Sequence, residues 1–243
     1  MSFITKQNEQ KQYTGSGKLF KYILPKNKAV HIIPLICPFE LTEDNQLIRY
    51  QFKTHFRKGE AAYLCDKSYS DGQYCAECEK TSSFGGQNFP TTTLTFPAYV
   101  LDLKGETYTS KSGSTGPENP EKLIEIPSGK KQLNWDLFQE TFYEDEFMST
   151  IWKIKKTDGG LSIQKADIKK LGNQLDLDVP QEVLDKYNGL TRGQKLGICL
   201  SVYQNVKWDH PDLIADGIVS PYESSKSEDS DQFSSDSEGD ALD

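Results

Sequence analysis

The chain has 243 residues, enough for one sizeable domain or for one domain with an appended helical piece. Hydrophobic residues make up 35% and aromatic residues 11%, so rings are plentiful relative to aliphatic side chains, and no apolar run approaches the roughly 20 residues of a membrane span. The net charge of −8 is concentrated at the C-terminal end, because residues 220–243 hold eight acidic residues and one lysine while the body is close to neutral.

The N-terminal half predicts closely spaced strands. A polar arm, 1–17, precedes strands at 18–24, 29–37 and 47–55, which are separated by turns at 25–28 and 43–45. In the third strand Ile48, Tyr50 and Phe52 alternate with polar residues, which places rings on one face and cations on the other. Strands joined by short turns favour an antiparallel sheet or barrel.

The middle of the chain predicts an insertion followed by more strands. Residues 55–87 are rich in Gly, Ser and Tyr and have too few apolar residues for a core of their own. Strands are expected at 91–103 and 122–126, with a flexible stretch at 105–120 between them. A helix is expected at 135–144 with Asn134 as its N-cap, and a hairpin at 150–156 and 161–166 turns at Asp158 to Gly160.

Residues 171–219 have a helical character. One helix is expected to begin at Pro180 and end near Gly189, and a second to begin at Thr191, with Gln194 completing a capping box. Apolar residues at i, i+3, i+4 and i+7 make the second helix amphipathic. Residues 220–243 have the composition of a disordered acidic tail.

The cysteine and histidine spacing is the most specific signal. His55, Cys65, Cys75 and Cys78 form the pattern His-x9-Cys-x9-Cys-x2-Cys. Zinc takes four N or S ligands in a tetrahedron, and a Cys-x2-Cys turn lets two thiolates approach one ion. We therefore predict one structural zinc ion, since four protein ligands leave no open position for catalysis and the zinc-deaminase signature is absent. Free thiols are the alternative.

The remaining cysteines and histidines have weaker claims on a metal. Cys37 and Cys199 lie in apolar runs, where a cysteine behaves as a small core residue. His31 is the alternative to His55 as the fourth ligand, and His210, followed by a proline, is expected in a loop.

The ligand spacing, with a basic context at residues 55–59, resembles the zinc subdomain of the T-even bacteriophage single-stranded-DNA-binding (helix-destabilising) proteins. Further similarity covers 98–104, 129–136 and 152–156 in the same order, so the resemblance spans about 18–170. It implies a mainly β (α+β) fold, with an OB-type antiparallel barrel over 18–170 and the zinc subdomain inserted at about 55–87. The sequence departs from the family at two places. The family's N-terminal arm carries a basic cluster, whereas residues 1–17 hold only Lys6 and Lys11, and the helical segment 171–219 has no counterpart in the family.

The resemblance implies sequence-independent binding of single-stranded DNA in phage DNA replication, recombination and repair, without enzymatic activity. Such binding needs cations for phosphates and exposed rings for bases. The candidate cations are Arg57, Lys58, Lys130, Lys131, Lys153, Lys155 and Lys156. The candidate rings are Tyr50, Phe52, Tyr69, Tyr74, Phe96, Tyr99 and Trp152. Core packing is the alternative for each ring, and a solvated face for each lysine.

The acidic tail is expected to compete with DNA for the cationic groove and, once displaced, to bind replication proteins such as a polymerase, a helicase or primase, or a loader. Its candidate contact residues are Glu228, Asp229, Asp231, Asp236, Glu238 and Asp240. The chain is expected to work in the cytoplasm of a bacterial host, not secreted and not on a membrane, as a monomer or self-associating on DNA. The N-terminus lacks the apolar region of a signal peptide.

Two other classes of function remain open. A zinc-ribbon transcription or polymerase-associated factor would use the zinc module to dock on a protein, with its rings in the core. A zinc nuclease is disfavoured, because the chain has three dispersed histidines and no evident nucleophile–base pair or phosphate-binding glycine loop.

Overall fold

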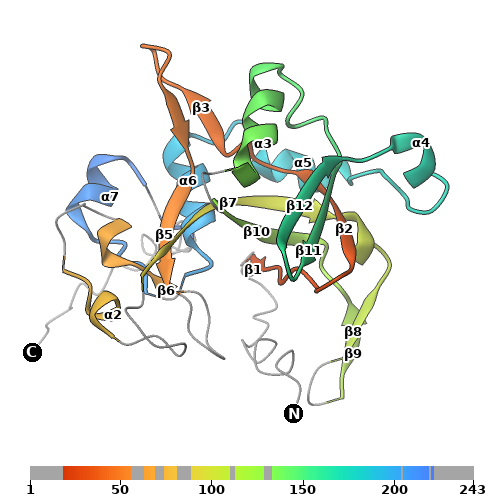
Figure 1. Cartoon of the computed structure of the whole chain (residues 1–243), viewed down its shortest axis with the longest axis horizontal. Coiled ribbons are helices and arrows are strands. Elements are labelled where there is room, and N and C mark those ends of the chain that lie inside the picture. The colour runs from red at the N-terminus through yellow and green to blue at the C-terminus, as the bar shows by residue number, and fades with distance from the viewer. Residues whose placement is uncertain are drawn as a thin grey trace, which may run out of the picture.

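The computed structural model describes residues 19–55, 63–68, 74–80, 89–109, 113–128, 133–203, 205–218 and 220–221 (Figure 1). Its strands are β1 (Phe20–Lys21), β2 (Ala29–Pro34), β3 (Phe39–Leu41), β4 (Leu47–Arg49), β5 (Gln51–His55), β6 (Tyr63–Leu64), β7 (Thr91–Val100), β8 (Thr107–Thr109), β9 (Thr115–Pro117), β10 (Glu121–Pro127), β11 (Trp152–Thr157) and β12 (Gly160–Lys165). Its α-helices are α2 (Ala76–Glu79), α3 (Leu133–Tyr143), α4 (Ile168–Leu171), α5 (Gln181–Tyr187), α6 (Arg192–Leu200) and α7 (Pro211–Ala215).

Eight strands form one mixed sheet in the order β1-β10-β7-β2-β11-β12, with β5 also on β7 and β6 on β5. Most pairs are antiparallel, but β1 runs parallel to β10. The mainly β expectation is confirmed. The expected OB-type antiparallel barrel is not what the described residues form: the sheet is mixed, and its strand order ends at β1 and β12 without closing. Beyond β1 the chain crosses toward β11, where Lys26 makes an isolated parallel bridge with Lys156.

Strand β7 organises the sheet. One of its edges pairs with β10 over residues 93–99, while the other edge is divided between β5 at 91–94 and β2 at 98–100. Pro97, which has no N–H, lies between these two stretches. Its carbonyl still accepts a hydrogen bond from Leu35. A proline is tolerated inside this strand because its missing donor faces the junction between two partner strands.

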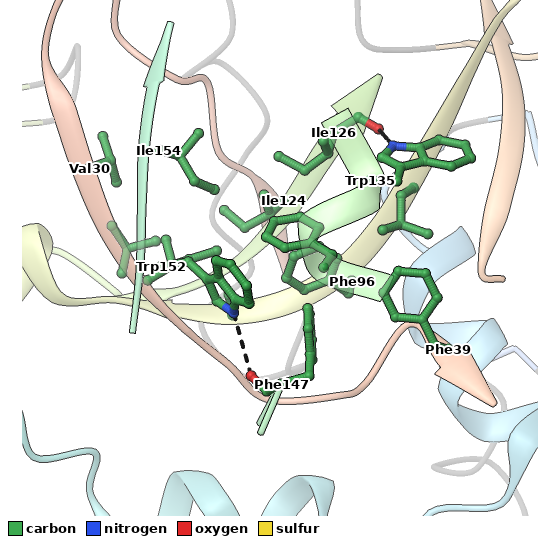
Figure 2. Close-up of a cluster of buried hydrophobic side chains, with 14 residues drawn as sticks. Val30, Phe39, Phe96, Ile124, Ile126, Trp135, Phe147, Trp152 and Ile154 are labelled. Atoms are coloured by element: carbon green, nitrogen blue, oxygen red, sulfur yellow. Dashed lines mark hydrogen bonds between the residues drawn. The ribbon is translucent and has the colours of Figure 1, made fainter. Parts of the chain in front are cut away.

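The main core lies between the sheet and α3, where rings gather (Figure 2). Trp135 donates from its indole Nε1 to the carbonyl of Ile126 at 3.0 Å, which ties the start of α3 to β10. Phe147 packs edge-to-face on Phe96, with ring centroids 5.9 Å apart. The helix already includes Leu133, so Asn134 lies inside it and the expected N-cap is wrong.

Local expectations elsewhere are largely met. The β11–β12 hairpin turns where expected, with Gly160 at φ 127°, and α6 has the capping box of Thr191 and Gln194. The long strand expected at 47–55 is interrupted at Tyr50, whose N–H donates to Pro38, so β4 pairs with β3 while β5 pairs with β7. The stretch expected to be flexible at 105–120 contains the β8–β9 hairpin.

The helices from α4 onward pack on parts of the sheet. Leu196, Leu200 and Leu213 pack on Tyr50 and Phe52 in a second core cluster. A third cluster unites residues of α4 and α5 with Tyr99 and its neighbours. Figure 1 shows α6 and α7 beside β5 and β6. The segment of 171–219 is therefore packed on the sheet over its described residues.

Candidate metal centre

Four side chains from three short segments meet at one point. His55 ends β5, Cys65 follows β6, and Cys75 and Cys78 bracket the start of α2. Their ligand atoms all lie within 4.8 Å of one another, and this group can hold a metal ion. These are the four residues predicted from the sequence.

The cluster is compact and buried. The sulfurs of Cys65 and Cys78 lie 3.7 Å apart, and Nε2 of His55 lies 3.4 Å from the sulfur of Cys75 and 3.5 Å from that of Cys78. No ligand side chain is more than 9% exposed. Because three thiols and one imidazole converge without an intervening side chain, the donor set suits a soft or borderline divalent ion.

The backbone around the cluster is held by hydrogen bonds. The N–H of Cys65 donates to the carbonyl of Lys53 on β5, and the N–H of Ser68 donates to the carbonyl of Cys65, each at 2.8 Å. In the Cys-x2-Cys turn, the N–H of Cys78 donates to the carbonyl of Cys75 at 3.0 Å. The Ser68 hydroxyl accepts from the N–H of Lys53 and donates to its carbonyl, both at 2.9 Å. Strand β5 therefore positions Cys65 as well as its own His55, while the Cys75–Cys78 turn is closed by its own hydrogen bond.

Burial sets the protonation of the thiols before metal binds. It raises the pKa of Cys65 to about 12, with the neighbouring thiols Cys75 and Cys78 adding to the rise. Burial also raises the pKa of Cys78. A metal ion must displace these protons, because the thiolate is the form that binds it, so metal affinity falls as the pH is lowered.

The other candidate ligands lie elsewhere. His31 is on β2, where its Nδ1 is 3.2 Å from a carboxylate oxygen of Asp102, so it is not the fourth ligand. Cys199 is fully buried in the second core cluster and Cys37 packs against the main core, as small core residues do. His210 caps α7, with its Nδ1 accepting from the N–H of Asp212.

Five of the seven predicted base-stacking rings are buried, which corrects the sequence analysis. These five rings are at most 8% exposed and cannot stack on bases in this structure: Tyr50, Phe52, Phe96, Tyr99 and Trp152. Phe96 and Trp152 belong to the core between the sheet and α3, and the other three rings are covered by the C-terminal helices. These aromatic side chains fill the core because the chain has few aliphatic side chains.

Two rings near the metal-binding segment in the chain are strongly exposed. Tyr74, predicted as a stacking residue, directly precedes Cys75 and is 74% exposed. Phe89, which the sequence analysis did not select, is 73% exposed just before β7. The sequence could have predicted this exposure, because Phe89 lies in a polar stretch, next to a proline and outside any alternating apolar pattern.

The predicted lysines of β11 are exposed. Lys153 and Lys155 point away from the core face that carries Trp152 and Ile154, and Lys156 is exposed at the strand end. Lys26 and Lys28 lie nearby, since Lys26 bridges to Lys156 and β2 begins opposite Lys155. Both lysines belong to the turn expected at 25–28, and the sequence did not indicate that this turn lies beside β11. Figure 1 shows α2 well apart from the β11–β12 hairpin, so Tyr74 and these lysines belong to separate parts of the molecule.

Several predicted residues lie outside the described residues. They are Arg57, Lys58, Tyr69, Lys130 and Lys131 among the DNA-binding candidates, and Glu228, Asp229, Asp231, Asp236, Glu238 and Asp240 in the tail.

Comparisons with known proteins assign no family. No protein-family model, no curated protein and no solved structure matches the chain. Among the described residues, none of the helices has the length and apolar character needed to cross a membrane.

Proposed function

We propose that the metal centre binds one structural zinc ion. With Zn–S bonds of about 2.3 Å and a Zn–N bond of about 2.0–2.1 Å, a tetrahedron sets two sulfurs about 3.8 Å apart and a sulfur and a nitrogen about 3.6 Å apart. The distances of 3.7 Å for Cys65 to Cys78, and of 3.4 and 3.5 Å from His55, are close to both values. Four protein ligands fill the coordination shell, which supports a structural role and disfavours a zinc nuclease.

We further propose that the protein binds single-stranded DNA without sequence preference, as the resemblance to the T-even phage proteins implies. The observation that carries this proposal is the pair of exposed lysines on the outer face of β11, Lys153 and Lys155, with Lys156 exposed at the end of the strand. The neighbouring strands β2 and β12 contain no carboxylate, and Asp102 reaches this face by its contact with His31. Lys153 pairs with His31 and Gln164, and Lys155 pairs with Ala29 and Ser162. A sheet face with cations and small or polar neighbours suits a phosphate backbone.

The DNA contacts proposed here differ from those expected from the sequence. The five buried rings are left out. Tyr74, which lies apart from the β11 lysines, is the described ring proposed to stack on a base further along the same strand. Lys153, Lys155 and Lys156 are proposed to bind phosphates. The OB-type arrangement is proposed as an opened barrel, supported by the crossing of the N-terminal segment from β10 to β11.

The tail completes the proposal. Residues 220–243 have a net charge of −7, and a tethered polyanion competes with DNA phosphates at high effective concentration. On a single strand the displaced tail would bind replication proteins in the cytoplasm of a bacterial host. DNA replication, recombination and repair all produce the single strands that such a protein covers.

The test is binding of a labelled oligo(dT) and of a duplex of equal length, followed by fluorescence anisotropy at several salt concentrations. We expect preference for oligo(dT) and an affinity that falls with salt. Replacing Lys153, Lys155 and Lys156 together by alanine should reduce the slope of log K against log salt by about 2, at about 0.7 per phosphate contact. Replacing the exposed Lys169 and Lys170 on α4 is the control, and absence of oligo(dT) binding at low salt would refute the proposal.

A second candidate is a protein-docking zinc module. The observation in its favour is that Tyr74, next to the ligand Cys75, and Phe89, just before β7, are exposed while five of the predicted rings are core residues. Aromatic side chains anchored beside a rigid site are typical of protein interfaces. This candidate predicts that Tyr74→Ala and Phe89→Ala weaken a complex with a polymerase and leave oligo(dT) binding unchanged.

A further inference from the structure

The C-terminal segment holds strand β6, which directly precedes the metal ligand Cys65. Asn205 pairs with both backbone groups of Leu64: its Oδ1 accepts from the Leu64 N–H at 2.9 Å, and its Nδ2 donates to the Leu64 carbonyl at 2.8 Å. Leu64 is the last residue of β6 and directly precedes Cys65. An amide side chain thus occupies the free edge of β6, opposite the edge that pairs with β5.

Two neighbours of Asn205 reinforce this contact. Lys207 forms an ion pair of 3.0 Å with Asp66, the residue after Cys65. Tyr203 packs edge-to-face on Phe52, with ring centroids 6.0 Å apart, and its hydroxyl lies 3.1 Å from that of Thr95. Tyr203, Asn205 and Lys207 therefore contact β5, β6, β7 and the residue after Cys65.

The segment that presents Asn205 is packed as one body. A Cβ atom at Gly193 of α6 would lie 1.8 Å from the carbonyl oxygen of Gly217, so the first turn of α6 touches the backbone that follows α7. Leu196, Leu200, Leu213 and Ile218 share one buried cluster. Residues 192–218 can therefore respond as a unit to a change at β6.

We propose that metal retention and docking of residues 192–218 on the sheet are thermodynamically linked, with Asn205 as the positioning residue that links them. When the metal fixes Cys65, β6 keeps its edge aligned for Asn205. When Asn205 is paired, Cys65 is held where the metal needs it. By reciprocity, the metal strengthens docking by the factor by which docking strengthens metal binding. This inference rests on the proposed metal and is independent of DNA binding.

The first experiment measures zinc release. The full-length protein is loaded with Zn²⁺, its metal content is measured, and a chromophoric chelator is added in excess. Asn205→Ala is expected to release zinc about ten-fold faster than the wild type, as is common when a group that orients a metal ligand is removed. Asn173→Ala, an exposed asparagine, and Val183→Ala, a destabilising change in the third cluster, should release it at the wild-type rate.

The outcomes separate the two proposals. Protein that takes up no zinc would overturn the metal assignment and the linkage with it. Protein that binds one zinc but shows the same release rate for Asn205→Ala as for the wild type would overturn the linkage alone. Equal acceleration in Val183→Ala would also overturn it, because the effect would then be general destabilisation.

The second experiment measures how metal removal affects the docking of residues 192–218 on the sheet. Hydrogen exchange followed by mass spectrometry is compared for zinc-loaded and chelator-treated protein. We expect faster exchange in 192–203 and 205–218 after metal removal, with little change in α5. Gly193→Ala, which pushes α6 from Gly217, should produce faster exchange there with zinc still present. Unchanged exchange in 192–218 after metal removal would overturn the proposal.

Discussion

Phe138 and Trp152 meet edge-to-face, with ring centroids 4.5 Å apart and an interplanar angle of 80°. This contact joins α3 to β11, and both side chains are fully buried. The pair therefore fixes the helix on the sheet, and the two rings contribute large apolar areas to the core.

Phe138→Ala should lower the free energy of unfolding by about 3–5 kcal/mol, because it removes a buried ring and leaves a cavity. Urea unfolding followed by circular dichroism measures the loss. Tyr143→Ala at the exposed end of the same helix is the control and should change stability by about 0.5 kcal/mol or less. A loss in Phe138→Ala as small as in the control would contradict the role given to this pair.

The metal centre predicts one zinc ion per chain. Cys75→Ser should lose most bound zinc, because a hydroxyl is a poor replacement for a thiolate, and should lower the melting temperature. Cys37→Ser, which lies away from the cluster, should keep full occupancy. Elemental analysis after dialysis measures the metal, and a chelator should lower the melting temperature of the wild type while leaving that of Cys75→Ser unchanged.

The exposed and buried rings predict opposite results in DNA binding. Tyr74→Ala should weaken oligo(dT) binding by about 1–3 kcal/mol if this ring stacks on a base. Trp152→Phe should lower stability and leave DNA affinity in the folded protein unchanged, because Trp152 is buried and its Nε1 is engaged with the carbonyl of Phe147 at 3.4 Å. Anisotropy titrations under conditions where each variant is folded provide the comparison, and a large loss in Trp152→Phe alone would reverse the assignment.

Tyr203 predicts a loss of stability at alkaline pH. Burial raises the pKa of its hydroxyl well above the ordinary value of 10.0, with the Glu125 carboxylate adding to the rise. The folded state therefore keeps a proton that the unfolded chain loses above about pH 10, so stability falls as the pH rises through that range. Tyr203→Phe should be less stable at pH 7, by about 1 kcal/mol from the lost hydrogen bond, yet its stability should fall less steeply above pH 10. Urea midpoints at pH 7 to 11 test this, and parallel slopes would exclude Tyr203 as the cause.

Removal of the acidic tail predicts tighter DNA binding. A chain ending at Pro221 should bind oligo(dT) more tightly than the full chain at low salt, because a tethered competitor is gone, and the difference should shrink as salt screens both interactions. The same chain should lose its complex with replication proteins. Replacing the acidic tail residues by their amides, at unchanged length, separates charge from chain length; equal affinity of full and truncated chains at low salt would rule out the competition.

Local sequence signals predicted local structure well. The capping box of Thr191 and Gln194, the Gly-Gly turn before β12 and the His55-to-Cys78 spacing depend on residues close in sequence, and the structure contains all three. Such signals are strong because the same few residues both specify and satisfy the geometry.

Features set by long-range packing were not predictable. The alternation at Tyr50 and Phe52 identified a face of rings correctly, but not that α6 and α7 cover that face. The hydrogen bonds between Asn205 and Leu64 join residues 141 positions apart, and no local sequence pattern predicts them. Likewise, the opening of the sheet depends on how β1, β10 and β11 meet.

Pro97 has a consequence for how the sheet comes apart. Because β7 pairs with β5 before Pro97 and with β2 after it, one long strand carries two pairing zones separated by a residue that contributes no donor to that edge. Separation of β5 from β7 can therefore stop at Pro97 while β2 stays paired beyond it and β10 stays paired along the opposite edge. The end of the sheet near the metal centre can therefore unfold locally while the aromatic core between the sheet and α3 stays folded.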